Sequence, residues 1–215
     1  NKGNQLNQFK CKKLNYPIDI LCTYVEIKDE KMEIDKDYLQ KYEEELTQKL
    51  LRQAHDLRCG AEQLYHTEDL EEMWHKIAPQ YMVDAVPEIA QYPTVAIAWA
   101  GYLGMGLAHL WDKDWEEVLR REDVYASLRD PRGFDEMDEY IIEGVMGYLL
   151  DSKTAQGFEN LMRSLSQTAL AQIRHEEIEP QSEMAFHVFA RTTKVMFRIG
   201  ASCELYRLGY KYEVR

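Results

Sequence analysis

Apolar and polar positions follow a helical period along most of the chain after residue 34. Apolar residues recur every three or four positions, which places them on one face of an α-helix. The pattern predicts helices over residues 35–65, divided at Gly60, and then over 68–79, 94–111, 134–150, 154–178 and 181–210. No stretch after residue 34 has the two-residue period of a strand. The sequence therefore predicts an all-α bundle of about six to eight helices.

Residues 1–34 have a different composition. Residues 1–17 are polar and rich in Asn, Gln and Lys, which predicts a loosely attached lead-in. The later stretch YVEIKDEKMEID alternates apolar and charged residues on both sides of KDEK, which favours a short β-hairpin, with a helical continuation as the alternative. We therefore expect a lead-in with a possible hairpin over 1–34 and one helical bundle domain over 35–215.

An uncharged run crosses the middle of the chain, where no residue between Glu88 and Asp112 carries a formal charge. Its length would allow a membrane span, but acidic residues on both flanks argue against one. A phosphate-binding loop is excluded because the glycines are spaced as Gly101-x-x-Gly104-x-Gly106 and follow no strand. The run therefore predicts a buried helix at the centre of the bundle and no association with a membrane.

Small residues give this central helix, residues 94–111, a narrow face. They are spaced four apart, so that a second helix can approach closely along them: Ala96, Ala100, Gly104 and Ala108. A glycine inside a helix costs up to about 1 kcal/mol relative to alanine, so the glycines here indicate close packing. We expect Gly144 and Gly147 in EGVMGYLL to provide the matching surface.

Composition and charge limit the classes of partner. The 215-residue chain is 45% hydrophobic and 30% charged, which is typical of a soluble globular protein, and its net charge is −12. Residues 112–143 hold twelve acidic side chains against five basic ones. Such a protein is repelled by nucleic-acid backbones and anionic lipids, so we expect neither as a partner.

Four cysteines are present without a CxxC pair: Cys11, Cys22, Cys59 and Cys203. A chain of this size needs no disulfides to fold. We therefore expect reduced thiols and a cytoplasmic location.

Tyr102 and His109 are the first candidates for chemistry. They lie seven positions apart, almost on one line of the central helix, and such a pair could line a ligand pocket or take part in acid–base chemistry. The structural alternative is that His109 pairs with Asp112 and the helix end, while Tyr102 bonds to a carbonyl group.

Glu72 and His75 are the candidate metal ligands. Their Glu-x-x-His spacing offers a carboxylate and an imidazole to a metal, as in di-iron bundles. A di-iron bundle needs two such motifs, and the chain has one. The sequence therefore identifies no cofactor, although a metal or small ligand is not excluded.

The last predicted helix carries a basic stripe with helical spacing: His187, Arg191, Lys194 and Arg198. Such a stripe could hold an anionic ligand or a phosphorylated partner. The alternative is that it pairs with the acidic residues of 112–143.

These observations favour a non-catalytic, cytoplasmic interaction or self-association domain, with a protein partner or a second copy of the chain. No nucleophile lies in a recognisable catalytic motif, which argues against an enzyme. The alternative function is binding of a small molecule or metal, with or without catalysis. Its pocket would lie between helices, near Tyr102, His109, Glu143 and the basic stripe.

Overall fold

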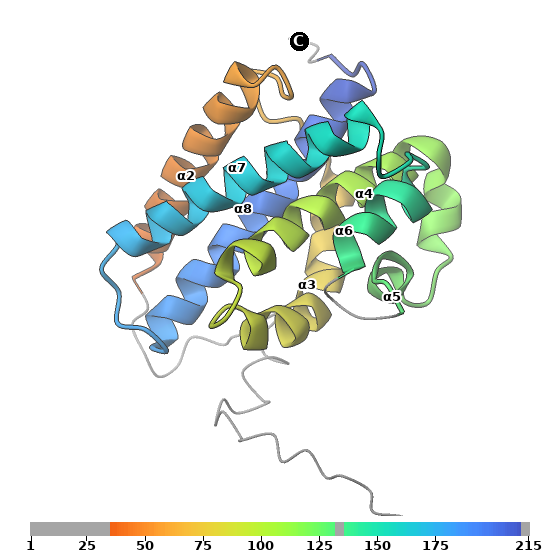
Figure 1. Ribbon diagram of the computed structural model, residues 1–215. Coiled ribbons are helices and arrows are strands. Elements are labelled where there is room, and N and C mark those ends of the chain that lie inside the picture. The colour runs from red at the N-terminus through yellow and green to blue at the C-terminus, as the bar shows by residue number, and fades with distance from the viewer. Residues whose placement is uncertain (1–34, 132–135, 212–215) are drawn as a thin grey trace, which may run out of the picture.

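The computed structural model describes residues 35–131 and 136–211, and Figure 1 shows that this part of the chain is built from helices. The prediction of an all-α fold is confirmed, with seven α-helices and one π-helix in the described ranges. The expected hairpin lies outside the described residues. The elements are α2 (Lys36–Asp56), α3 (Glu68–Glu88), α4 (Pro93–Leu119), α5 (Val124–Leu128), α6 (Met137–Glu139), η3 (Tyr140–Val145), α7 (Lys153–His175) and α8 (Glu183–Arg207).

Local sequence signals set the helix starts. At α2, α3, α7 and α8 the residue before the helix accepts a hydrogen bond from the backbone N–H three positions later, which satisfies one free donor of the first turn. These residues are Asp35, Thr67, Ser152 and Ser182. α4 begins instead at Pro93, whose fixed φ suits the first helical position.

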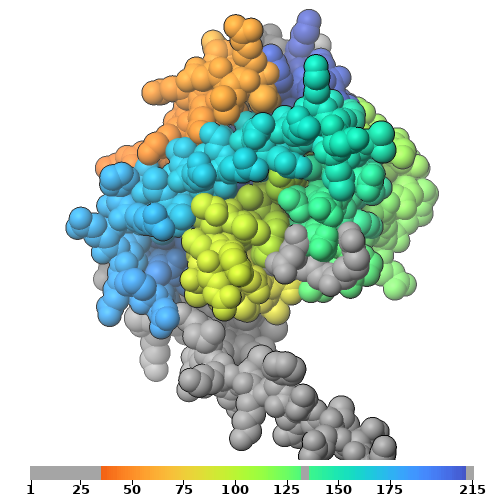
Figure 2. Space-filling view, viewed as in Figure 1, coloured from red at the N-terminus to blue at the C-terminus, as the bar shows by residue number. Residues whose placement is uncertain are grey.

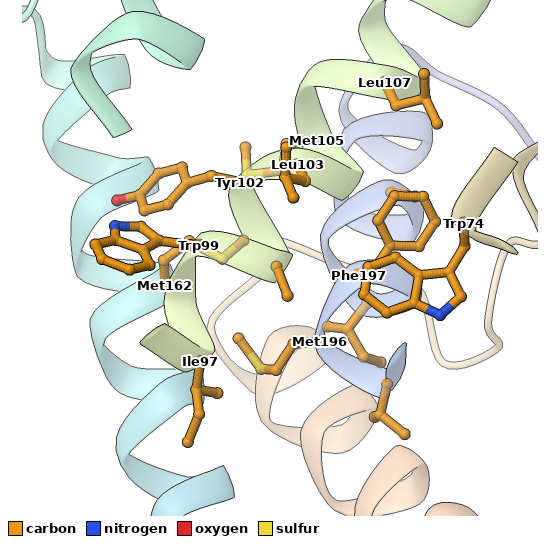
Figure 3. Packing of buried hydrophobic residues seen from close by; sticks show 14 of the residues in the cluster. Trp74, Ile97, Trp99, Tyr102, Leu103, Met105, Leu107, Met162, Met196 and Phe197 are labelled. Atoms are coloured by element: carbon orange, nitrogen blue, oxygen red, sulfur yellow. The ribbon is translucent and has the colours of Figure 1, made fainter. Parts of the chain in front are cut away.

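α4 is the central helix that the uncharged run predicts. Its residues from Ala96 to Ala108 are buried with the single exception of Ala98, which is partly buried. Trp99 and Tyr102 extend from α4 toward Met162 of α7, as Figure 3 shows. None of the described helices is long and apolar enough to cross a bilayer.

The partner of the small-residue face is α8. A Cβ atom on Gly104 would overlap the carbonyl oxygen of Phe197, and one on Gly200 would overlap that of Gly101. The expectation that Gly144 and Gly147 supply this surface is therefore wrong. The atoms nearest to a Cβ on Gly144 would be those of Tyr140 in its own π-helix, and Gly147 has a positive φ with open space around it.

Several helix boundaries differ from those that the apolar periodicity of the sequence predicts. α2 ends at Asp56, because Arg58 turns into the left-handed region at φ 58°. α3 continues through Pro79 to Glu88, since Ile77 and Tyr81 on either side of the proline are buried in the core. The segment expected to be helical over 134–150 forms only α6 and η3 within its described part.

α4 itself is broken near its C-terminal end. Asp114 has extended backbone angles, φ −165° and ψ 86°. Its carboxylate accepts a hydrogen bond from the Glu117 N–H at 2.9 Å, and so caps the short helical piece that follows.

Candidate functional site

Five charged side chains from three helices meet on one side of α8. Glu43 comes from α2, Glu71 from α3, and Arg191, Lys194 and Arg198 from α8, and we call this set the α2–α3–α8 cluster. The three cations share a face of α8 because they follow a three-to-four spacing. With two carboxylates against three cations, the cluster has one positive charge in excess.

Glu71 is the more firmly held carboxylate. Arg198 donates to it from Nε and Nη2 at 2.8 and 2.7 Å, which is the planar two-point geometry of a strong ion pair. The Lys194 ammonium lies 3.0 Å from the same carboxylate. Burial alone would raise the pKa of Glu71, but these cations outweigh it and lower that pKa to about 2.

Glu43 is shared among all three cations. Arg191 and Arg198 each donate to it from Nη1, at 2.8 and 2.9 Å, and the Lys194 Nζ lies 3.6 Å away. The Glu43 side chain is 13% exposed, whereas that of Arg191 is 37% exposed. Arg191 therefore forms the outer edge of the cluster.

The expected pairing of the basic stripe with residues 112–143 is wrong. The three cations of the cluster pair with α2 and α3, which pack against the same face of α8. In Figure 1, α2 lies on the opposite side of the bundle from α5 and α6, which belong to the acidic segment. His187, the first residue of the stripe, lies 3.7 Å from Glu183 of its own helix, and burial lowers its pKa.

Acidification should remove the contribution of Glu71 to stability. Because the pKa of Glu71 is lower in the folded chain than its ordinary 4.5, this contribution is complete above pH 4.5 and is lost as the pH falls toward 2. Glu71→Gln should cost roughly 1–2 kcal/mol at pH 7, allowing for solvent screening, and almost nothing near pH 2. Urea unfolding at a series of pH values measures this difference.

Glu72→Gln is the matched control, because the Glu72 side chain is 71% exposed. It should change stability by no more than about 0.5 kcal/mol. A constant cost of Glu71→Gln from pH 7 to pH 2 would contradict the assignment of the lowered pKa to the ion pairs.

The two candidate metal ligands do not act together. Glu72 pairs with Lys76 at 3.0 Å, and the His75 Nε2 lies 3.8 Å from Glu71 instead. His66 lies at 4.0 Å from Glu71 on its other side, and burial together with the charge of Arg198 lowers the pKa of His66. Over residues 35–131 and 136–211, no group of three His, Cys, Asp or Glu side chains could hold a metal ion.

An open pocket lies against the cluster, between α2 and α8. Its volume is about 600 Å³, which is within the size range of small-molecule sites. It is lined by Lys36, Gln40, Glu43, Glu44, Thr47, Gln48, Arg191 and Arg198. Arg191 and Arg198 thus both bind Glu43 and line this pocket.

A second charged group surrounds Glu204 of α8, whose side chain is completely buried. Arg207 donates to its two oxygens at 2.5 and 2.6 Å, and the His109 Nδ1 lies 2.9 Å from one of them. Arg207 also donates to the Tyr148 hydroxyl at 2.7 Å. We call these four residues the Glu204 cluster; it joins α4, α8 and the segment after η3.

The other residues predicted for the interhelical pocket lie apart from one another. Tyr102 is buried, and burial raises its pKa. Glu143 is exposed on η3. In the described part of the chain, no hydrogen bond or ion pair joins any two of Tyr102, His109 and Glu143.

Sequence reasoning missed both carboxylates of the α2–α3–α8 cluster and most of the Glu204 cluster. Glu43 and Glu71 lie far from α8 in the sequence and have no local signal. Glu204 does have one: it is a lone charge in the apolar stretch IGASCELY, with Arg207 three positions later on the same face.

Comparisons of the chain with protein-family models, curated proteins and solved structures found no match.

Proposed function

We propose that the chain is a helical ligand-binding protein that holds a small anionic molecule in the pocket between α2 and α8. The observation that carries this proposal is the position of Arg191. It lines the pocket and its side chain is 37% exposed. Of the donor atoms of Arg191, Nη1 alone makes a hydrogen bond to a described residue, Glu43. A guanidinium has five N–H donors in a planar fork that fits carboxylates and phosphates.

The charge of the cluster supports the same proposal. The chain carries a net charge of −12, yet this cluster has more cations than anions. The rest of the pocket lining adds one cation, Lys36, one anion, Glu44, and neutral polar groups such as Gln40 and Gln48. An anion bound here would neutralise the one positive charge by which the cations of the cluster exceed its carboxylates.

Isothermal titration of the wild-type chain with inorganic phosphate, sulfate and citrate tests this function. At least one anion should bind with a millimolar or stronger dissociation constant, and Arg191→Gln should weaken it about tenfold, which corresponds to the loss of one charge-assisted contact. Arg174→Gln removes the same charge from an exposed position of α7 and should leave the affinity unchanged. Equal weakening by both variants, or no binding to the wild type, would reject the proposal.

Self-association is the second candidate function. Three apolar side chains are exposed around the α3–α4 corner: Val83 at 54%, Tyr92 at 54% and Val95 at 39%. The first turns of α4 lie at the surface in Figure 2, beside α7 and above α3. Sedimentation velocity measures the oligomeric state directly, and a monomer at high concentration would leave this candidate without support.

The proposed location is the cytoplasm. Cys59 and Cys203 are both free thiols, as expected of a protein in a reducing compartment.

A further inference from the structure

We infer that Glu43 sets the ligand class of the pocket, as a built-in competitor that only a dianionic group such as a phosphate monoester displaces efficiently. This inference rests on the proposed function and concerns the same site. Glu43 lines the pocket and already occupies the position of an anion between Arg191 and Arg198.

The two carboxylates of the cluster differ in how they are held. Arg198 places both Nε and Nη2 on Glu71, so Glu71 stays fixed to α8. Glu43 receives a single donor from each arginine and lies at the pocket wall. Glu43 is therefore the carboxylate that an incoming anion can replace.

This replacement gives a ligand the donors on both arginines that Glu43 now occupies. Arg198 uses three of its five N–H donors, Nε and Nη2 on Glu71 and Nη1 on Glu43, so a ligand that takes the place of Glu43 gains the Nη1 donor that Glu43 now occupies. A ligand that stayed on the outer edge of Arg191 would lie close to the like charge of Glu43, which is unfavourable.

The charge of the ligand then decides whether it displaces Glu43 efficiently. When a ligand displaces Glu43 from the arginines, the three cations of the cluster keep one paired carboxylate, Glu71. The cluster then has an excess of two positive charges. A monocarboxylate only restores the charge that Glu43 supplied, and its binding also costs translational and rotational entropy. A phosphate monoester carries about −1.5 to −2 at pH 7 and three acceptor oxygens, so it neutralises this excess and can bind both guanidinium groups.

Titration with methyl phosphate and with acetate tests the inference. The wild-type chain should bind methyl phosphate at least about tenfold more tightly than acetate. Glu43→Gln keeps the shape of the side chain but removes the competing charge, so it should tighten both ligands about tenfold and bring acetate into the measurable range. The wild-type comparison needs no variant, so it decides the ligand class even if Glu43→Gln folds poorly.

Glu45→Gln is the matched control. Glu45 lies on the same helix but outside the lining of this pocket, and its 56% exposed side chain pairs with Lys41, so this variant should leave the preference and both affinities close to those of the wild type. Equal wild-type affinities for methyl phosphate and acetate would overturn the ligand class. Unchanged or weaker binding by Glu43→Gln would overturn the competitor role, even where Arg191→Gln has confirmed the anion site. A phosphoserine peptide that bound tenfold more tightly than methyl phosphate would overturn the assignment to a small molecule.

Discussion

Gly200→Ala should lower the free energy of unfolding by about 3 kcal/mol or more. Overpacking usually costs about 1–3 kcal/mol, and a contact between rigid groups belongs at the upper end of that range. The added Cβ would overlap the carbonyl oxygen and carbon of Gly101. These are backbone atoms of α4, so no side-chain rotation can relieve the overlap. The crossing of α4 and α8 would have to widen, and it carries the most extensive contact between any two elements of the described fold.

Urea unfolding of three alanine variants separates this steric cost from the ordinary preference of helices for alanine. Gly157→Ala should stabilise by up to about 1 kcal/mol, because Gly157 lies within α7 and a Cβ there meets nothing within 4 Å. Gly101→Ala should fall between the two, since its Cβ would first meet the flexible Met162 and Met196 side chains. A loss at Gly200 no larger than that at Gly101 would show that the two backbones are not in close contact.

The same glycines show how far sequence reasoning reaches. The spacing of Gly104 with Ala100 and Ala108 predicts that a helix approaches this face, because small side chains every fourth residue form a ridge. It does not predict which helix approaches. Gly200 and Gly144 are both small residues in helical stretches, and only the folded arrangement of the helices brings Gly200 to α4.

The charged clusters show the same limit: their spacing along one helix could be predicted, but their partners on other helices could not. The spacing of Arg191, Lys194 and Arg198 along one helix is local, so the stripe could be predicted. Its partners lie 148 positions away for the pair Arg191–Glu43 and 127 for the pair Arg198–Glu71. Abundant acidic residues at 112–143 suggested another pairing, but the position of α2 and α3 against α8 decides it, not the number of charges.

Arg207→Met should cost about 3 kcal/mol, because it leaves a buried carboxylate without its main partner. Glu204 is completely buried, and Arg207 supplies two of the hydrogen bonds that compensate its charge. Methionine keeps most of the length and apolar surface of arginine. The loss therefore measures the missing charge and donors, with only the His109 contact left to Glu204.

The double variant Glu204→Gln, Arg207→Met decides whether buried charge is the cause. Removing both charges leaves a neutral amide beside His109, so the double variant should be more stable than Arg207→Met alone by about 1–2 kcal/mol. Arg174→Met on the exposed face of α7 should stay within about 0.5 kcal/mol of the wild type. If the double variant is no more stable than Arg207→Met alone, Glu204 does not depend on Arg207, and the stability of this end of α8 comes from apolar packing.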